Sequence, residues 1–145
     1  MPPFFIPPIS FLLPNAKPVA FLYSIGYNEL MITFINTASF RDWLSRLKDR
    51  KAKARISSRL RSALLGNFGD CAPVGEGVFE MRIHAGPGYR VYYTRRGETV
   101  YVLLAGGDKS SQVRDIAKAK SIANALREEE KKERNDDREN RTSGF

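Results

Sequence analysis

Polar side chains alternate with apolar ones along two short segments in the middle of the chain, residues 78–84 and 89–95. If both segments are strands, every second side chain points to the same face of a sheet. The face opposite the apolar one then carries six polar residues: Glu80, Arg82, His84, Arg90, Tyr92 and Thr94. Because like charges that share a sheet face destabilise it, we expect an anion there, either a bound ligand or the carboxylate of Glu80.

The two polar rows share a face only if directly opposed residues have the same parity. This condition places Arg82 opposite Arg90 or Tyr92, which requires a corner of three or five residues around the sequence AGPG at 85–88. Since the helices must cover the apolar face of the sheet, we expect the polar face to be open.

A further cation follows the third strand of this region. The apolar segment 98–105 ends in the sequence GGDKSSQ, in which Lys109 should emerge at the edge of the sheet. Paired glycines at a strand end let the backbone pass close to a ligand. Asp108, Ser110 or Ser111 can cap the helix that comes next. Lys109 would thus join the two arginines at one anion.

The distribution of charge indicates a polyanionic ligand. Residues 31–127 contain 18 basic and 8 acidic side chains, a net charge of +10, whereas the whole chain carries +8. A domain with this charge attracts nucleic acid, because binding releases condensed counterions. Cys71 is the only cysteine, so the chain has no disulfide framework and no cysteine-based metal site, which suits a reducing cytoplasm.

Sequence periodicity predicts the elements that position these residues. Residues 31–36 favour a strand, and Thr37 can cap a first helix. A second helix is predicted over 49–67, with Gly66 as its stop. A surface loop, three strands and a last helix follow: 66–77, 78–84, 89–95, 98–105 and about 111–127. The order β-α-α-β-β-β-α predicts an α+β fold, a small and mainly antiparallel sheet with two N-terminal helices packed on one face and a C-terminal helix.

Two of the predicted helices have faces of different character. The last helix should turn an apolar row toward the sheet: Val113, Ile116, Ala119, Ile122 or Ala123, and Leu126. The second helix carries Lys51, Arg55 and Arg59 four residues apart on its outer side. Such a stripe is typical of a solvated helix face, and it could also contact RNA.

The two ends of the chain differ from the region between them. Residues 1–30 hold six of the eight prolines, and their longest apolar run is too short to span a membrane. We expect an irregular extension upstream of a functional start at Met31, or else a genuine arm. The tail 128–145 has five basic and seven acidic residues, which predicts a disordered tail beyond a possible helical continuation.

Three stretches of the sequence together resemble one known group of proteins: FRDWLSRLKDRKAKARISSRL, GNFGDCAPVGEGVFEMRIHAGPGYRVYY and LLAGGDKSSQVRDIAKAK. They resemble the RelE/ParE toxin superfamily and, within it, the HigB-like, phage-derived (Gp49-like) addiction module killer proteins. The resemblance covers about residues 31–123. Its most specific part is GPGYRVYY followed by GGDKSSQ.

The resemblance implies a RelE-like fold and a cytoplasmic toxin of a type II toxin–antitoxin pair. Most such toxins are endoribonucleases that cut mRNA, often on the ribosome, and a helix-turn-helix (HigA-like) antitoxin silences them. Carried over by position, Arg90 is the strand arginine that serves the scissile phosphate. Arg82 and Lys109 match basic positions on the preceding strand and after the last strand. The lysine pair of RelE has no counterpart here, where Glu80 and Arg82 stand nearby.

These residues permit RNA cleavage without a metal or another cofactor, by attack of the 2′-OH on the adjacent phosphorus. Arg82 and Arg90 would clamp the phosphate, and Lys109 would add a charge. Either Glu80 or His84 could act as the general base. Tyr92 could stack on a nucleobase, orient the phosphate, or simply pack in the sheet.

Two other functions fit the same sequence. One is a ParE-like toxin that binds a protein target such as DNA gyrase. The other is an inactive, RNA-binding relic that uses Lys51, Arg55 and Arg59 for contact. Growth arrest without transcript cleavage would favour the first of these alternatives over the nuclease.

Overall fold

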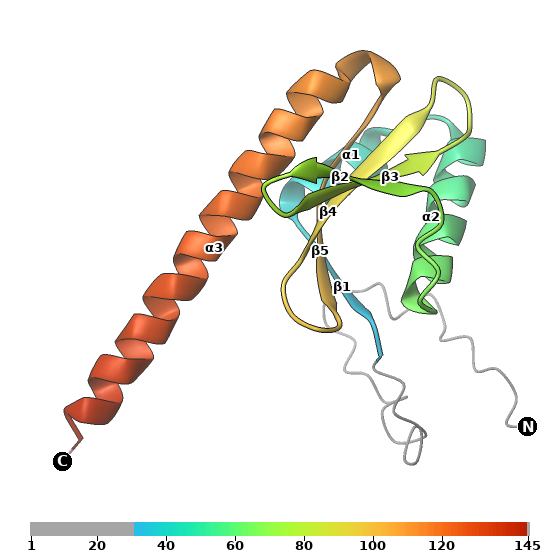
Figure 1. Cartoon of the computed structure of the whole chain (residues 1–145). Coiled ribbons are helices and arrows are strands. Elements are labelled where there is room, and N and C mark those ends of the chain that lie inside the picture. Colours follow the sequence, from blue (N-terminus) through green and yellow to red (C-terminus); the bar gives the residue numbers. More distant parts are fainter. Residues whose placement is uncertain (1–30, 145) are drawn as a thin grey trace, which may run out of the picture.

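The computed structural model describes residues 31–144, and the predicted irregular extension at 1–30 lies outside the described residues. The elements follow in the order β1 (Thr33–Asn36), α1 (Ala38–Arg46), α2 (Arg50–Leu64), β2 (Cys71–Gly75), β3 (Val78–Ile83), β4 (Tyr89–Arg95), β5 (Val100–Asp108), a 3-10 helix η3 (Lys109–Ser111) and α3 (Gln112–Thr142). Figure 1 shows the sheet between α3 on one side and α2 on the other.

Five strands form one sheet in the order β1-β5-β4-β3-β2. Only β1 and β5 run parallel, with Thr33 paired to Val100, and the other neighbours are antiparallel. The predicted α+β class with a mainly antiparallel sheet is confirmed. The last strand, β5, lies between β1 and β4, so the residues that follow it emerge beside β4.

Strand β2 was not predicted, because residues 66–77 read as a surface loop. Cys71 pairs with Met81 and Ala72 with Glu80, and the register shifts between Pro73 and Gly75. A proline is tolerated on an edge strand, where one side of the backbone has no partner. The glycines and the proline that suggested a loop are thus the features of a short, irregular edge strand.

The predicted cap of the first helix, Thr37, and the predicted start and stop of the second helix are confirmed. The hydroxyl of Thr37 accepts a hydrogen bond from the backbone N–H of Phe40 at 3.2 Å and so caps α1. Asp49 caps α2 by accepting from the N–H of Ala52 at 3.1 Å. Gly66, with φ of +92°, follows the end of α2 and donates its N–H to the carbonyl of Ala63.

The helices cover both faces of the sheet. Helices α1 and α2 pack on the face that carries Met81, Val91, Tyr93 and Leu103. Helix α3 packs on the opposite face, where Ala119 and Ala123 contact a second apolar cluster made of these residues: Val78, Tyr92, Val102, Leu104 and Ala105. The expectation that one face stays open is therefore wrong, and the side chains of alternating strand residues are buried on both sides.

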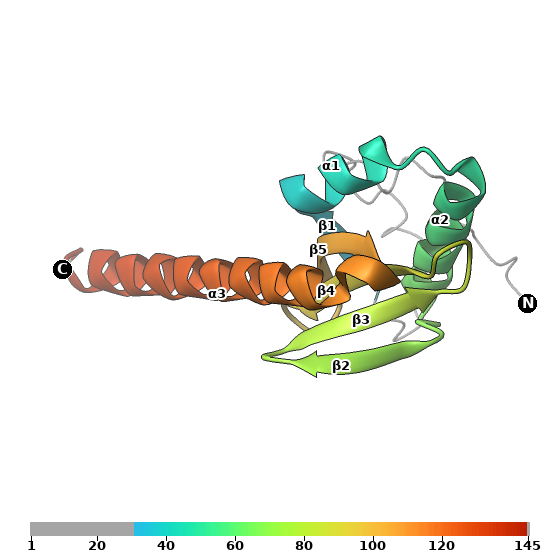
Figure 2. The same ribbon diagram turned by 90° about the horizontal axis from the view of Figure 1, so that it is seen from above.

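Helix α3 differs from its prediction at both ends. Val113 is 86% exposed instead of inward, because Asp115, two residues later and nearly on the opposite side of the helix, is buried against β5. At the other end α3 continues to Thr142, so the possible helical continuation extends through nearly all of the stretch for which the sequence predicts a disordered tail. This part extends well beyond the sheet (Figure 2). Ion pairs of Glu128 with Lys131 and of Glu130 with Arg96 support the continued helix.

Candidate functional site

The candidate site lies where β3 and β4 meet at their connecting corner. Arg82 on β3 is directly opposite Arg90 on β4, and Ile83 pairs with Tyr89. The corner between them, 84–88, therefore has five residues, which is one of the two predicted lengths. The prediction that the two guanidiniums share one face of the sheet is confirmed.

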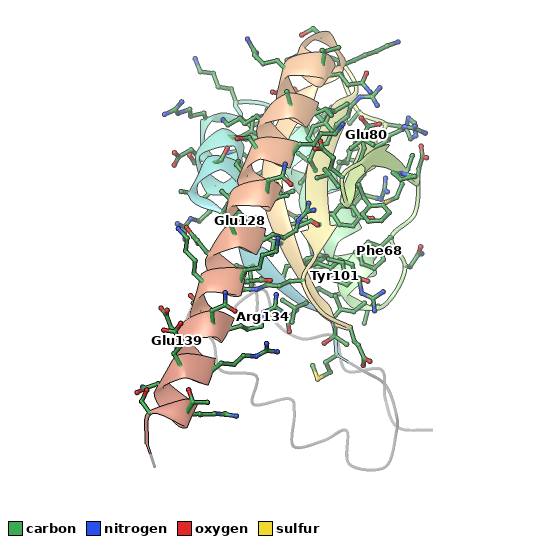
Figure 3. The ribbon with its side chains drawn as sticks, turned by 60° about the vertical axis from the view of Figure 1, so that its left-hand side comes forward. Phe68, Glu80, Tyr101, Glu128, Arg134 and Glu139 are labelled. Atoms are coloured by element: carbon green, nitrogen blue, oxygen red, sulfur yellow. The ribbon has the colours of Figure 1, made fainter. Side chains whose placement is uncertain are left out.

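A buried carboxylate lies beside both guanidiniums. Glu80 is 1% exposed and accepts hydrogen bonds from four side chains. The donors are Nε of Arg82 at 3.1 Å, Nη1 of Arg90 at 2.5 Å, the hydroxyl of Tyr92 at 3.3 Å and Nε2 of Gln112 at 2.9 Å. Figure 3 shows Glu80 at the strands beside α3. Of the two anions that the sequence allowed, the structure thus provides the internal one.

Tyr92 is a packed residue of this face. Its ring is completely buried beneath α3, in the cluster with Val102 and Leu104. Burial, and secondly the neighbouring carboxylate of Glu80, raise the pKa of the Tyr92 hydroxyl well above its ordinary value. Of the alternatives predicted for Tyr92, packing in the sheet fits this position, and stacking on a nucleobase does not, since α3 occupies the space in front of the ring.

The two arginines differ in their access to solvent. The side chain of Arg82 is 42% exposed, whereas that of Arg90 is only 14% exposed. Nε of Arg90 is buried and has no hydrogen-bond partner among residues 31–144. A buried donor without an acceptor costs free energy, so residues 31–144 leave this nitrogen unsatisfied.

Asp70, in the loop before β2, joins Arg82 and His84 at the outer edge of the site. Its carboxylate accepts from Nη1 of Arg82 at 3.3 Å and contacts Nε2 of His84 at 2.8 Å. The hydrogen bond with His84, together with the charge of Arg82, lowers the pKa of Asp70. His84 itself is 75% exposed. The carboxylate therefore orients an imidazole whose other ring nitrogen remains accessible.

Lys109 lies just beyond β5, next to the same corner. Tyr89 pairs with Asp108, and the Cβ of Lys109 is 3.8 Å from where a Cβ of Gly88 would stand. The side chain of Asp108 accepts from the backbone N–H of Ser110 at 2.8 Å and thereby caps η3. Lys109 is exposed and directly follows the end of β5 that pairs with Tyr89 and Arg90.

The paired glycines of β5, Gly106 and Gly107, were predicted to let the backbone approach a ligand, and the structure shows another reason for them. A Cβ on Gly106 would stand 2.1 Å from the ring of Trp43 on α1, and one on Gly107 would stand 1.8 Å from Asp115 on α3. The close approach is therefore to side chains of this protein on both faces of the sheet, and not to a ligand. The carboxylate of Asp115 also accepts a hydrogen bond from the hydroxyl of Ser111.

The three residues of the predicted basic stripe of α2, Lys51, Arg55 and Arg59, have different environments. Lys51 and Arg55 are exposed. Arg59 instead donates from its guanidinium to the backbone carbonyls of Arg82 and Phe68, at 2.5 and 2.9 Å. Arg59 thus fixes the loop before β2 to the end of β3, so the expectation that it contacts RNA does not fit its position. Lys51 and Arg55 are still placed as predicted on the outer side of α2.

Two residues of the site, Asp70 and Gln112, were not identified from the sequence. Asp70 lies within the glycine-rich stretch GNFGDC, and Gln112 begins α3. The position of Gln112 after a strand end was a usable signal, because the first turn of a helix that follows a strand lies close to that strand. Asp70 offered no comparable signal, since β2 was taken for a loop.

In residues 31–144, no three side chains of His, Cys, Asp or Glu gather in the way that a metal site requires. No helix within the same residues is long and apolar enough to cross a membrane.

Comparison with known proteins identifies the family of the chain. The model of the family "Phage derived protein Gp49-like (DUF891)" matches residues 42–130. An uncharacterized protein of Haemophilus influenzae (strain Rd) is 45% identical over 97 residues, which are 67% of this chain and 98% of that protein. The chain therefore belongs to the phage-derived Gp49-like family, the group of addiction module killer and RelE-like proteins. This membership is compatible with the toxin of a toxin–antitoxin pair.

Proposed function

We propose that this protein is the toxin of a type II toxin–antitoxin pair and acts as a metal-independent endoribonuclease on mRNA, in association with the ribosome. The observation that carries the proposal is the pair of opposed guanidiniums, Arg82 and Arg90, at an accessible corner of a domain with a net charge of +10 over residues 31–127. Membership of the RelE-like group supports the same reading.

The chemistry needs no metal or external nucleophile. The 2′-oxygen of one nucleotide attacks the adjacent phosphorus, and the bond between phosphorus and the 5′-oxygen breaks. The proton of the 2′-hydroxyl passes to a base, and the departing 5′-oxygen gains a proton. The products are one RNA end with a 2′,3′-cyclic phosphate and another with a 5′-hydroxyl, which gives the proposal a chemical signature.

The cations would stabilise the charge that develops on the phosphate. Arg90 and the half-exposed Arg82 would donate to the non-bridging oxygens through the N–H groups that Glu80 does not occupy. Lys109 would add a point charge from the end of β5. A donor that is fixed before the reaction contributes about 3–4 kcal/mol to stabilising a transition state, so each of these three groups has a measurable share.

His84 is the better candidate for the general base. Its imidazole is exposed and oriented by Asp70 at 2.8 Å, which leaves the second ring nitrogen for the 2′-hydroxyl. The carboxylate of Glu80 is buried and already accepts four hydrogen bonds. The proposed partner in the cell is a helix-turn-helix antitoxin that blocks this corner.

The proposal is tested by expressing the protein and mapping the ends of cellular transcripts, together with cleavage of single-stranded RNA by the purified protein. Wild type should arrest growth and produce cyclic phosphate ends. His84→Gln should slow cleavage by about 100-fold, the lower end of general acid–base contributions. Arg90→Lys keeps the charge but loses the planar guanidinium, and it should also relieve arrest, as should Lys109→Ala.

Lys118→Ala is the matched control for Lys109→Ala, because Lys118 is an exposed lysine of α3 away from the corner. It should arrest growth as the wild type does. Growth arrest with intact transcripts would overturn the nuclease and favour a ParE-like toxin that binds a protein such as DNA gyrase. RNA binding with neither cleavage nor arrest would identify an inactive relic.

A further inference from the structure

We infer that Glu80 is a positioning residue, which fixes Arg82 and Arg90 for one phosphodiester of single-stranded RNA and takes no proton during the reaction. This inference rests on the proposed function and adds to it a role for the most deeply buried charged side chain of the site. The evidence is the complete set of contacts around one carboxylate.

The carboxylate has no lone pair left for a substrate proton. An ionised carboxylate can accept about four hydrogen bonds, two on each oxygen. Oε1 of Glu80 accepts from Nε of Arg82 and Nη1 of Arg90, and Oε2 accepts from the hydroxyl of Tyr92 and Nε2 of Gln112. Every acceptor position is therefore used inside the protein, and Glu80 is 1% exposed.

The same contacts bring the two guanidiniums together. Because both donate to Oε1, the two nitrogens cannot lie further apart than the sum of the 3.1 and 2.5 Å hydrogen bonds. Without the carboxylate, two cations directly opposed across a strand pair would repel each other. Each guanidinium uses only one N–H group on Glu80, so each retains further donors for a phosphate.

The other oxygen is held from two different elements. Tyr92 reaches Glu80 from within β4, and Gln112 reaches it from the first turn of α3. The neutral donors add no charge, but they prevent the carboxylate from rotating about its terminal bond. The arginine pair is therefore held in one arrangement before any ligand binds, which lowers the cost of ordering it on binding.

A positioning role and simple electrostatics predict opposite effects of the same substitution. Glu80→Gln removes a negative charge beside two cations, so charge alone would tighten the binding of RNA. If Glu80 positions the guanidiniums, the amide keeps one oxygen for them but turns its N–H₂ group toward Tyr92 and Gln112, which are donors to Oε2 in the wild type. The end of the side chain is then no longer fixed, and binding weakens. The sign of the change therefore distinguishes the two explanations.

The experiment measures binding of a short single-stranded RNA with 2′-O-methyl groups, which cannot be cleaved, by fluorescence anisotropy. We expect Glu80→Gln to weaken binding about tenfold, since misplaced groups cost heavily in a fixed site. Glu98→Gln makes the same charge change in the exposed turn before β5, and it should bind as well as wild type or slightly better. Tighter binding by Glu80→Gln would overturn the inference.

Gln112→Ala keeps every charge and truncates only a half-buried side chain of the first turn of α3, so it covers the case in which Glu80→Gln does not fold. It should weaken binding about threefold, the effect of one hydrogen bond, while the protein stays folded with a somewhat lower melting temperature, because the buried Glu80 loses one donor. Wild-type affinity in a folded Gln112→Ala would contradict the inference.

Cleavage of unmodified RNA over a range of pH separates positioning from proton transfer. In Glu80→Gln the rate should fall at all pH values, with the acid limb of the profile kept, because that limb belongs to another base. Loss of the limb would make Glu80 the base and overturn the inference. If the wild type binds the methylated RNA but does not cleave unmodified RNA, the proposed nuclease function is wrong. The binding measurements alone then decide the role of Glu80.

Discussion

Single residues of the site are held by contacts between segments far apart in the chain, and Asp70 is the clearest case. From the loop before β2, its carboxylate forms hydrogen bonds with the side chains of Arg82 and His84. Because these contacts lower the pKa of its carboxyl below the ordinary value of 3.8, the folded state favours the ionised form. The resulting stabilisation is complete above that ordinary value and is lost as pH falls through the lower pKa of the folded state.

We therefore expect Asp70→Asn to unfold at a lower denaturant concentration than wild type at pH 6, with the difference shrinking as pH falls through 3.8 and below. Denaturant midpoints between pH 6 and 2.5 provide the measurement. A difference that stays constant over this range would show that the carboxylate charge contributes nothing to the contact with Arg82 and His84.

For single residues, the sequence predicted contacts between neighbouring strands better than contacts with helices and loops. Strand parity and the length of the corner placed Arg82 opposite Arg90, because alternation along a strand is a local rule. The burial of Glu80 depends on which helix covers its face, and the contact of Asp70 with His84 depends on the path of a loop. Neither follows from local spacing.

Among the elements, β5 is the one whose composition the neighbouring helices dictate. Trp43 of α1 packs over Gly106, and Asp115 of α3 packs over Gly107 on the other face. A methyl group at either position would overlap a side chain that is itself confined. Trp43 also packs against the rings of Phe40 and Tyr89, so it has little room to move.

Gly106→Ala should destabilise the fold by about 1–3 kcal/mol, as overpacking of a filled core does. Gly97→Ala is the matched control, since nothing lies within 4 Å of a Cβ at that turn residue. The free energy of unfolding of both variants, from denaturant titration, checks the prediction. Equal stability of the two variants would mean that the side chain of Trp43 can adopt another conformation without loss of packing.

The elements with regular periodicity were predictable, and the irregular ones were not. Thr37, Asp49 and Gly66 mark helix ends through local hydrogen bonding and backbone conformation, so α1 and α2 agree closely with their predictions. Strand β2 was not predicted, because its glycines and proline are typical of loops as well as of edge strands. The charged part of α3 was predicted only as a possible continuation of the helix, because composition alone does not register pairs such as Glu128 with Lys131.

Over the whole molecule, positive charge gathers on α1, α2 and the turn between them. Seven basic residues there are exposed, and none forms an ion pair within 4 Å among residues 31–144: Arg41, Arg46, Lys48, Arg50, Lys51, Arg55 and Arg61. The portion of α3 beyond the sheet mixes both signs, as Glu128, Arg134 and Glu139 in Figure 3 illustrate. The two surfaces should therefore respond differently to salt.

If the surface of α1 and α2 contacts RNA, the affinity for RNA should fall steeply with salt, and replacing Lys51 and Arg55 together by Ala should make that dependence shallower. Each lost contact with a phosphate of a single strand reduces the slope of log K against log salt concentration by about 0.7. Replacing Lys132 and Arg138 on the projecting part of α3 removes the same charge and should leave the slope unchanged. Equal slopes for both double variants would argue against contact through α2.

The arrangement of layers was the part of the fold that sequence reasoning missed most. The sequence pattern does not reveal that the second face of the sheet is also buried, because the cluster on that face includes Tyr92, Ala105 and small residues of α3. Charge and tyrosines suggested a solvated surface, although Tyr92 satisfies its hydroxyl on Glu80 and can therefore be buried. The basic character of 31–127, which depends only on composition, needed no knowledge of layers.

The length of α3 also affects how the molecule tumbles. A helix of 31 residues is about 46 Å long at 1.5 Å per residue, and roughly its second half has no sheet beside it. Such a rod adds friction mainly to rotations that swing it sideways through water. Backbone N–H vectors along α3, which lie nearly parallel to the rod, should therefore show faster transverse relaxation than those of the sheet, which point in other directions.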